Sequence, residues 1–417
     1  MPKKKAVGTE KKKTLALVSL GCAKNAVDLQ NRVGALLKNE YILSRDPDRA
    51  DTVLINTCAF IESARKEAEA EIVRAIQLKS KGNYNKIIVA GCYPQRYPAA
   101  LARFPGVDEW LGVPKDWQKP SIPGLRFTGK AYAYLKIAEG CSHRCAYCAI
   151  PAIRGRFRSR PEADIIAEAR ALLKSGCREL NIVAQDPMLW RGENKRKLPD
   201  LLWKLDSLKG DFWIRVLYSY PNEITEEFVE WMNLARHAVK YIDVPLQHTV
   251  PEVLEKMNRA RAIAASREAP FVLREVIPGV TLRTTIMVGF PGETEARFKW
   301  LLSDLRRMQF DRLGVFAYSP EEGTIGAQMR GRPSKAIALK REKAVARLAS
   351  DIWEKKALRL VGSRFKALVI ASGVARMESQ APEVDGVVYL DSDAVGEFVE
   401  VELVSVKGCD FDGRVVS

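Results

Sequence analysis

Three cysteines stand close together in the sequence, Cys141, Cys145 and Cys148, in the spacing Cys-x-x-x-Cys-x-x-Cys. Three thiolates from one loop can hold three corners of a four-iron cluster and leave the fourth iron without a protein ligand. Structural zinc is the alternative, but it needs four closed ligands. The fourth would have to be His143, whose reach inside the same short loop is poor. The spacing therefore favours an iron–sulfur cluster with one open iron.

Three further cysteines, Cys22, Cys58 and Cys92, are far apart in the sequence but share a position, because each follows an expected strand. The carboxyl ends of parallel strands meet at one edge of a sheet, where ligands bind. Three unrelated core cysteines are the alternative, but the shared position favours a second three-cysteine cluster. The remaining Cys177 and Cys409 stand alone and are interpreted as small packed thiols.

The elements that must position the second set form an N-terminal parallel α/β sheet. Apolar runs predict buried strands at Thr14–Gly21, Thr52–Thr57 and Lys86–Gly91. Apolar residues at helical spacing lie between them, which indicates crossover helices. The Pro- and Gly-containing residues 112–129 then interrupt the pattern and are typical of a linker.

A second alternating series follows and predicts a partial (β/α)6 barrel, with the Cys141 loop directly after its first strand. The expected strands are Tyr134–Ala138, Glu179–Gln185, Phe212–Tyr218, Val239–Pro245, Thr281–Gly289 and Arg312–Ser319. A long helix is expected at Lys335–Leu358. Short β-branched runs then predict a small β-barrel, with strands at Phe365–Ile370, Gly386–Leu390 and Glu397–Val404.

The predicted domains are residues 1–13, a disordered basic tail; 14–125, the α/β sheet; 126–356, the partial barrel; and 357–417, the β-barrel. The formal net charge of +16 is unevenly distributed, because residues 1–13 carry +5 and residues 357–417 carry −4. No apolar run approaches the length of a membrane span, and no signal peptide is visible at the N-terminus. Clustered cysteines suit a reducing compartment, and we expect a cytoplasmic protein.

The cysteine triad also carries a resemblance. With Tyr147 before its last cysteine, it resembles the radical S-adenosylmethionine superfamily. The resemblance implies that the open iron is chelated by the amino and carboxylate groups of the methionine moiety. It also implies that reduction cleaves the sulfonium to a 5′-deoxyadenosyl radical, which abstracts hydrogen from an unactivated C–H bond. An ordinary general base cannot remove such a proton near neutral pH.

Three further stretches, Ser19–Asn25, Asn56–Ile61 and Ala90–Pro94, resemble the N-terminal domain of the methylthiotransferases within that superfamily. The resemblance implies an auxiliary 4Fe-4S cluster on Cys22, Cys58 and Cys92, whose open iron carries the sulfur to be transferred. The motif Gly-Cys-Ala-Lys-Asn is similar to that of the branch that modifies an aspartate of ribosomal protein S-twelve, whereas the tRNA-modifying branch has Gly-Cys-Gln-Met-Asn.

Five further motifs agree with the ribosomal branch: Tyr134–Cys141, Ile150–Gly155, Asp243–His248, Gly289–Thr294 and Ala381–Gly386. The resemblance extends from Thr14 to Val416, and the C-terminal segment is similar to a TRAM domain. The chain departs from the family pattern at Leu29-Gln30, at Pro187–Trp190 and at Arg259–Pro270.

Contacts with S-adenosylmethionine are expected from residues at the mouth of the partial barrel. Gln185 ends the second strand, and the superfamily contacts the methionine amino group there. Gln247, His248 and Arg283 are predicted at or near the carboxyl ends of later strands, and Gly289 gives close backbone approach. Each of these also has a structural alternative, as a capping, turn or satisfied lip residue. Tyr147 completes the expected cofactor-binding set.

The resemblance implies a transferase that adds a methylthio group to the β-carbon of an aspartate in ribosomal protein S-twelve. It implies two 4Fe-4S clusters, two molecules of S-adenosylmethionine, a low-potential electron donor such as flavodoxin or ferredoxin, and a sulfur donor, with no membrane partner. The alternatives are the same chemistry on a tRNA adenosine and a non-catalytic iron–sulfur protein that docks on ribosomes. Because residues 357–417 are acidic, we expect them to bind the basic ribosomal protein rather than tRNA.

Overall fold

The computed structural model describes residues 12–117, 120 and 122–416. The chain divides into two compact units, with the boundary in the sequence after Leu125. Residues 1–11 of the expected basic tail lie outside the described residues. Lys13, which we assigned to that tail, is instead the first residue of strand β1. In the described part of the chain, no helix has both the length and the apolar character needed to cross a membrane.

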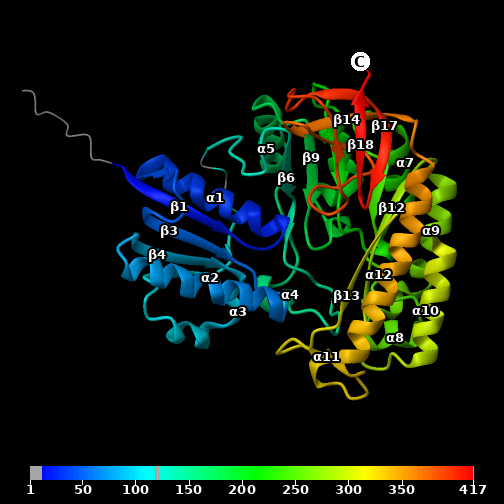
Figure 1. Cartoon of the computed structure of the whole chain (residues 1–417), viewed down its shortest axis with the longest axis horizontal. Coiled ribbons are helices and arrows are strands. Elements are labelled where there is room, and N and C mark those ends of the chain that lie inside the picture. The colour runs from blue at the N-terminus through cyan, green and yellow to red at the C-terminus, as the bar shows by residue number, and fades with distance from the viewer. Residues whose placement is uncertain (1–11, 118–119, 121, 417) are drawn as a thin grey trace, which may run out of the picture. The chain divides into compact units, whose positions relative to one another are not determined.

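The first unit is a parallel five-stranded sheet in the order β2-β1-β3-β4-β5 (Figure 1). Its strands are β1 (Lys13–Ser19), β2 (Tyr41–Leu43), β3 (Ala50–Thr57), β4 (Tyr84–Gly91) and β5 (Glu109–Leu111), and its helices are α1 (Ala23–Asn39), α2 (Glu62–Ser80) and α3 (Cys92–Arg96). Leu29 and Val33 of α1 pack against Leu15 and Leu54 of the sheet, as their helical spacing predicted. Strand–helix alternation therefore produced the predicted parallel sheet.

The second unit begins with the predicted partial barrel. Its parallel strands form two three-stranded sheets, in the orders β6-β9-β10 and β11-β12-β13. An isolated bridge between Ile214 and Ala238 connects them. The strands are β6 (Tyr132–Lys136), β9 (Glu179–Val183), β10 (Trp213–Val216), β11 (Tyr241–Asp243), β12 (Thr281–Val288) and β13 (Arg312–Ala317), and the short β7 (Ala138–Glu139) and β8 (Arg158–Ser159) pair separately.

Helices cover the outer face of this barrel and bury one continuous apolar core against its strands (Figure 1). The second unit also contains the short helices α4 (Ile150–Arg154), α8 (Pro251–Lys256) and α11 (Ile325–Gln328). The helices that contribute to the core are α5 (Glu162–Lys174), α6 (Leu198–Asp206), α7 (Glu226–Leu234), α9 (Ile263–Val276), α10 (Glu295–Met308) and α12 (Lys335–Leu358). The last, α12, is the predicted long helix, and the Ser334 side chain accepts a hydrogen bond from the backbone N–H of Ile337 at its start.

The C-terminal strands form a closed barrel in the order β14-β15-β16-β18-β17. Its strands are β14 (Arg364–Ala371), β15 (Val374–Met377), β16 (Val388–Tyr389), β17 (Phe398–Lys407) and β18 (Asp410–Val415). The sequence predicted β14, β16 and β17 but missed β15 and β18. Charged residues interrupt the apolar pattern of both missed strands.

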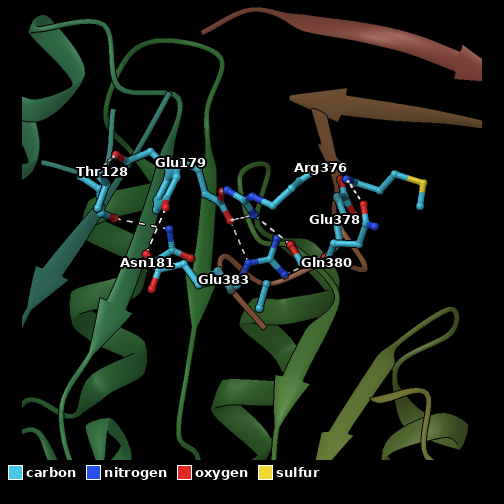
Figure 2. Close-up of polar contacts among 12 residues, drawn as sticks. Thr128, Glu179, Asn181, Arg376, Glu378, Gln380 and Glu383 are labelled. Carbon is cyan, nitrogen blue, oxygen red and sulfur yellow. Dashed lines mark hydrogen bonds and ion pairs between the residues drawn. The ribbon is translucent and has the colours of Figure 1, made fainter. Parts of the chain in front are cut away.

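Buried ion pairs join this C-terminal barrel to the amino edge of the partial barrel (Figure 2). The Glu179 carboxylate, at the start of β9, pairs with Arg376 of β15 and accepts a hydrogen bond of 2.8 Å from Nε of Arg215. All three side chains are at most 1% exposed. Arg376 also donates to the carbonyl of Gln380 at 2.8 Å. Because buried charges are stable only when paired, these contacts hold the two barrels together.

Candidate functional site

Two cysteine-lined edges: the N-terminal sheet

The first group of predicted ligands lies at the carboxyl edge of the N-terminal sheet. Cys22 precedes the first residue of α1, Cys58 follows the last residue of β3, and Cys92 is the first residue of α3, directly after β4. Cys22 is exposed, Cys58 half-buried and Cys92 buried. The structure thus places each cysteine where its strand ends, as the sequence predicted.

The strand register shows that these ends are neighbours. Thr57 of β3 pairs with Gly91 of β4, so Cys58 and Cys92 follow paired residues. A Cβ on Gly21 would lie 3.0 Å from the Cβ of Cys58, which puts the turn before Cys22 in contact with that cysteine. The three cysteines therefore come from three loops that meet at one edge.

Two asparagines tie these loops together. The side-chain nitrogen of Asn25 donates to the carbonyls of Leu20 at 2.9 Å and Thr57 at 3.1 Å. The side chain of Asn56 returns a hydrogen bond of 2.9 Å to the carbonyl of Asn25. Both asparagines are at most 1% exposed, so these bonds lie in a medium where they hold the backbone firmly. The sequence words that contain Asn25 and Asn56 were recognised, but the bracing role of the two side chains was not foreseen.

The Thr57 hydroxyl adds a third tie, to β4. It donates to the carbonyl of Ala90 at 2.6 Å and accepts from the backbone N–H of Tyr93 at 3.3 Å. Tyr93 directly follows Cys92, so this tie sets the position of the third cysteine loop. The backbone at this edge is thus held by side chains of the first two motifs, which bond to backbone groups of all three.

Two cysteine-lined edges: the partial barrel

The second group of predicted ligands lies in the loop between β7 and α4. The backbone N–H of Cys141 donates to the carbonyl of Gly155 at 3.1 Å, and that of Cys148 donates to the carbonyl of Cys145 at 3.0 Å. Gly140 has a φ of +74°, and a Cβ there would lie 2.3 Å from the carbonyl oxygen of Arg156. Only glycine fits this close approach, so Gly140 allows the loop to fold back on the chain after α4.

Contacts from the far side of the barrel hold the middle of the same loop. The backbone N–H of Ala146 donates to the carbonyl of Met257 at 2.9 Å, and the carbonyl of Ala146 accepts from the N–H of Gly326 at 2.7 Å. The side chain of Asn258 donates to the carbonyl of Arg144 at 2.7 Å. The cysteine loop is therefore anchored at several points before any metal is considered.

Arg259 places a buried cation against this loop. Its guanidinium lies 4.0 Å from the Cys145 sulfur and 3.5 Å from the Tyr147 hydroxyl, and it donates to the carbonyl of Pro245 at 2.9 Å. It also covers the ring of Tyr220, 4.1 Å from the centroid. A buried positive charge thus lies beside one of the predicted iron ligands. The sequence signalled Arg259 only as the start of a departure from the family pattern.

His143 lies in the loop as a supporting residue. Its ring stacks on Tyr220 with centroids 4.2 Å apart, and its Nε2 lies 2.7 Å from a carboxylate oxygen of Asp186. Asp186 in turn accepts from the backbone N–H of Met188 at 3.1 Å. The ring is thus held between a carboxylate and an aromatic face, beside the cysteines.

The donor set of each edge suits an iron–sulfur cluster. Burial, opposed by a backbone hydrogen bond from His143 and reinforced by the charge of Cys145, raises the pKa of Cys141 to about 11, so binding iron would have to displace its proton. In the described residues, no three His, Cys, Asp or Glu side chains surround a position for a single metal ion. The assignment of all six cysteines as ligands remains a prediction.

Polar groups at the barrel mouth

Several buried polar atoms line the carboxyl ends of the barrel strands and have no hydrogen-bond partner among the described residues. They are both side-chain polar atoms of Gln185, the hydroxyl of Ser219 and the amide oxygen of Gln247. Gln185 follows β9, Ser219 follows β10 and Gln247 follows β11. Because unpaired buried polar groups cost free energy, a row of them at one edge fits a polar ligand such as S-adenosylmethionine.

Gln247 adopts a left-handed backbone conformation with a φ of +69°. Its N–H donates to the carbonyl of Thr285 at 2.8 Å, and its carbonyl accepts from the N–H of Met287 at 2.7 Å. Such a conformation is unfavourable for a residue other than glycine and is maintained here by two backbone bonds to β12. The amide oxygen of this side chain is buried and has no partner among the described residues, which supports Gln247 as a contact residue.

His248 has a structural role. Its Nδ1 accepts from the N–H of Val250 at 3.0 Å, so Nε2 carries the proton and donates to Glu293 at 3.2 Å. Glu293 also accepts 2.7 Å from Arg341 and 3.0 Å from the N–H of Gly289. Both ring nitrogens are satisfied and the side chain is fully buried, which favours the alternative of a satisfied lip residue.

Arg283 was expected near the carboxyl end of its strand, and this position was wrong. It is the third residue of β12, and its guanidinium pairs with Asp243 at 3.3 Å and with Asp385 of the C-terminal segment at 3.4 Å. The β12 strand began at the predicted residue, so counting along it would have found the amino-end position. Its carboxylate partners favour a structural role, although a cofactor contact remains a prediction.

Gly289 and Tyr147 complete the predicted set. Gly289 follows β12 with a φ of +78°, and a Cβ there would lie 2.5 Å from the Cβ of Ala338 in α12. Its close approach is thus to a helix of this chain, which the sequence did not foresee. Tyr147 is half-buried, and its ring meets Phe290 edge to face at 6.4 Å. Tyr147 belongs to the cysteine loop, and its hydroxyl lies 3.5 Å from the Arg259 guanidinium.

The first two departures from the family pattern, at Leu29-Gln30 and Pro187–Trp190, lie at mostly buried positions. Leu29 is 2% exposed in the N-terminal core, and Trp190 is fully buried, with its indole N–H donating to the carbonyl of Arg160 at 3.1 Å. These substitutions therefore contribute to packing. Of the two single cysteines, Cys177 is a buried thiol as predicted, whereas Cys409 is exposed and the packed-thiol prediction was wrong for it.

Comparison with known proteins

Models of three protein families match successive parts of the chain. "Uncharacterized protein family UPF0004" matches residues 14–112, "Radical SAM superfamily" matches residues 135–305, and "TRAM domain" matches residues 361–416. These matches correspond to the N-terminal sheet, most of the partial barrel and the C-terminal barrel.

Curated relatives match along almost the whole chain. A protein of Elusimicrobium minutum named "Ribosomal protein uS12 methylthiotransferase RimO" is 37% identical, over 96% of this chain and 99% of the relative. The protein of the same name from Geobacter sulfurreducens is 38% identical, over 97% of this chain and 99% of the relative.

Solved structures show a similar fold. The radical S-adenosylmethionine methyltransferase TsrM from Kitasatospora setae superposes with a TM-score of 0.54 at 15% identity and covers 72% of each chain. The cobalamin-dependent S-adenosylmethionine radical enzyme OxsB gives a TM-score of 0.51 at 13% identity, over 83% of this chain and 56% of that one. At these identities the likeness concerns the fold alone.

The partial barrel with its three-cysteine loop, the N-terminal sheet with three cysteines at one edge, and the C-terminal barrel occur here in the order of the matched families. The chain therefore belongs to the RimO-type methylthiotransferase family of radical S-adenosylmethionine enzymes, transferases that use S-adenosylmethionine and two 4Fe-4S clusters.

Proposed function

We propose that this enzyme transfers a methylthio group to the β-carbon of an aspartate in ribosomal protein uS12, the S-twelve protein of the small ribosomal subunit. The observation that carries the proposal is the full-length similarity to relatives named for uS12, together with a cysteine triad at each of two strand edges. The Gly21–Asn25 word, whose asparagine braces the auxiliary edge, supports this branch over the tRNA-modifying one.

Cys141, Cys145 and Cys148 are proposed to hold the cluster that binds S-adenosylmethionine. When bound and reduced, this pair supplies the radical that removes hydrogen from the substrate carbon. Arg259 places a positive charge 4.0 Å from the Cys145 sulfur, which would favour the reduced, more negative state of the cluster. The Gly140 turn and the backbone bonds of the loop hold the three sulfurs in position.

Gln185 and Gln247 are proposed to contact S-adenosylmethionine, because their buried amide atoms need polar partners that the described chain does not provide. The Ser219 hydroxyl, which the sequence did not single out, is in the same position at the end of β10. Tyr147 and the backbone at Gly289 complete the proposed pocket. Arg283, also predicted to contact S-adenosylmethionine, has its charge already compensated by Asp243 and Asp385.

Cys22, Cys58 and Cys92 are proposed to hold the auxiliary cluster that delivers sulfur. Asn25, Asn56 and Thr57 keep the three loops at one edge, so they act as positioning residues. The radical formed at the substrate carbon must meet this sulfur directly. The proposed function therefore requires the cysteine edge of the N-terminal sheet to face the barrel mouth during the reaction.

A low-potential electron donor, such as flavodoxin or ferredoxin, and a separate sulfur donor complete the proposed reaction, because neither electrons nor sulfur come from the described residues. We propose the cytoplasm as its location, where ribosomes and reduced thiols coexist. The domains proposed for these roles are residues 14–125, 126–356 and 357–417.

Mass spectrometry of uS12 and of tRNA after anaerobic incubation with the reconstituted enzyme, S-adenosylmethionine and a reductant tests the proposal. We expect one methylthio group on an aspartate of uS12 and none on tRNA. A methylthio-adenosine in tRNA with unmodified uS12 would assign the chain to the tRNA-modifying alternative. Unmodified samples of both, from enzyme that cleaves S-adenosylmethionine, would refute the substrate assignment while leaving the radical chemistry in place.

A further inference from the structure

A cationic cavity of about 620 Å³ lies where the amino edge of the partial barrel, the end of α12 and the C-terminal barrel meet. Its charged lining residues are six cations, Lys240, Arg312, Lys356, Arg359, Arg364 and Lys366, and two acids, Asp311 and Glu378. The volume is in the range of small-molecule sites. Positive charge thus collects at the base of a C-terminal segment whose own net charge is −4.

Arg312 is the deep residue of this cavity. Its side chain is 6% exposed, and in the described structure neither Nε nor Nη2 has a hydrogen-bond partner. Its guanidinium lies 3.4 Å from the centroid of the Trp353 ring. Burial lowers the pKa of Arg312, and the nearby carboxylates only partly oppose this effect. Two unpaired N–H groups and a partly compensated charge in a buried position are costly, and an anionic ligand in the cavity would compensate that charge.

The other cations differ in how far they are already compensated. Lys356 donates to a carboxylate oxygen of Asp311 at 2.5 Å, and Lys366 pairs with Asp211 at 3.0 Å. Arg364 lies 3.7 Å from Glu402. Arg359, the residue after α12, is exposed at the rim. The cations therefore lead from the exposed Arg359 to the buried Arg312, whose charge is only partly compensated.

The cavity also has an apolar wall and a position remote from the cysteines. Val280, Leu360, Phe365 and Met377 line it beside the cations, which gives a surface for a ring or another apolar group. Arg312 is the first residue of β13, whereas the polar mouth residues follow the opposite, carboxyl ends of the strands. With a rise of about 3.3 Å per residue, a strand of the length of β12 separates the two ends by roughly 25 Å. The cavity is thus outside the site described above.

We propose that this cavity binds a small phosphorylated molecule of nucleotide size, with its phosphate against Arg312 and its ring against the apolar wall. A lining with four more positive than negative groups suits a multiply charged anion, and guanidinium forks match phosphate oxygens in pairs. The carboxylates exposed elsewhere on the same C-terminal barrel disfavour a long polyanion such as RNA, which would have to pass them.

Calorimetric titration of the anaerobic holoenzyme tests this proposal, with ADP, pyrophosphate, inorganic phosphate and adenosine as the probes. S-adenosylmethionine is kept at saturation, so that adenine binding at the barrel mouth does not contribute. We expect saturable binding of ADP, weaker binding of pyrophosphate and phosphate, and none of adenosine. No heat of binding from ADP or pyrophosphate would overturn the proposal.

Two variants locate the site. Arg312→Gln should weaken ADP binding at least about tenfold, because it removes a charge-assisted bond in a buried setting. Arg359→Glu, at the exposed rim, should weaken it about three- to tenfold. Lys355→Glu is the matched control, because Lys355 is an exposed residue in the last turn of α12 that does not line the cavity, and it should leave ADP affinity unchanged.

The rim variant keeps the test decisive if Arg312→Gln folds poorly. Iron content and S-adenosylmethionine cleavage should stay at the wild-type level in Arg359→Glu, which separates this site from the proposed function. Equal weakening by Lys355→Glu and Arg359→Glu would reduce the effect to general surface charge and refute the site. A single-stranded RNA oligonucleotide that binds through Arg312 and Arg359, while ADP and pyrophosphate stay silent, would replace the proposed small ligand by RNA.

Discussion

The carboxylate of Glu179, at the start of β9, forms a buried ion pair with Arg376 of β15, 197 residues further along the chain. A second guanidinium, that of Arg215, lies on the other carboxylate oxygen at 2.8 Å. The pair crosses the boundary between the partial barrel and the C-terminal barrel, as Figure 2 shows. The two barrels therefore share a charge network that neither can satisfy alone.

Replacing Arg376 by Met should destabilise the second unit by about 3–5 kcal/mol, because it leaves part of the Glu179 charge without compensation in a buried position. The free energy of urea unfolding, followed by circular dichroism, measures this. Arg414→Ala is the control, since Arg414 forms an exposed pair with Glu402 and its loss should cost at most about 1 kcal/mol. Similar losses for the two variants would contradict a special role for the buried pair.

The same network predicts a dependence on pH. Burial opposes ionisation of Glu179, but Arg376 and Arg215 outweigh it and hold the pKa of this carboxyl below its usual value. A lowered pKa stabilises the fold above the unfolded-state pKa, and this contribution is lost as pH falls through the folded-state pKa. The stability difference between wild type and Glu179→Gln should therefore be largest near neutral pH and shrink below about pH 4. Unfolding midpoints across this range measure it, and a difference that grows on acidification would contradict the assignment.

Replacing Cys141, Cys145 and Cys148 by Ala should lower the iron content of the reconstituted enzyme from about eight to about four per chain and abolish S-adenosylmethionine cleavage. Replacing Cys22, Cys58 and Cys92 should also halve the iron, but leave cleavage measurable while methylthio transfer stops. Iron analysis and detection of 5′-deoxyadenosine check both outcomes.

Cys409→Ala serves as the control for both triads, because Cys409 is exposed in the turn between β17 and β18, and this variant should keep all the iron. One equivalent of tightly bound zinc per triad, without charge-transfer absorbance, would disprove the iron–sulfur assignment.

Arg259→Gln should make the cluster of the Cys141 loop harder to reduce, because the lost positive charge stabilised the reduced state. We expect the midpoint potential to fall by an amount on the order of tens of millivolts, measured by a redox titration monitored by electron paramagnetic resonance. Arg144→Gln removes an exposed charge from the residue next to Cys145 and should shift the potential less. An unchanged potential in Arg259→Gln, with full iron, would leave Arg259 a purely structural role.

The acidic face of the C-terminal barrel gives the last prediction. Asp391, Asp393 and Glu400 are exposed, and reversing them to Lys should slow modification of uS12 at low ionic strength, because complementary charge raises the rate of encounter. The effect should fade as salt is added, and iron content should not change. Reversing Asp351 and Glu354, exposed on α12, is the control and should have little effect. Salt-independent slowing would indicate damage to the fold.

The order of the elements was predictable because strand–helix alternation has a strong periodic signal. All nine strands predicted for the sheet and the partial barrel exist, and Cys22, Cys58 and Cys92 each follow a strand of the N-terminal sheet. The short edge strands β2 and β5 were missed, because three residues carry too little pattern. In the C-terminal barrel, β15 and β18 contain charged residues that mask the alternation. No sequence pattern indicated that Arg376 is buried, because the carboxylate that pairs with it lies far away in the chain, in β9.

The parts of the candidate site that depend on residue type and spacing were predictable from the sequence. The parts that depend on contacts between residues far apart in the chain were much less so. Thiols in a fixed spacing point to a cluster whatever surrounds them. The role of Arg283 depended on Asp385, 102 positions away, and the bracing by Asn25 depended on Thr57; neither contact has a local signal. Arg259 was passed over because a long-range approach to Cys145 leaves no trace in the residues beside it.

Gly140 carries a consequence for how this protein can change over generations. Every amino acid that a single nucleotide change can put in place of glycine has a Cβ, and at Gly140 that atom would lie 2.3 Å from a backbone oxygen. Drift at this codon is therefore confined to synonymous changes, although the residue has no atom that binds a metal. A saturation library scored for viability under conditions that demand the enzyme should show Gly140 as intolerant as Cys141 beside it. Constraint on such an enzyme falls on the residue that makes room for a ligand as heavily as on the ligand.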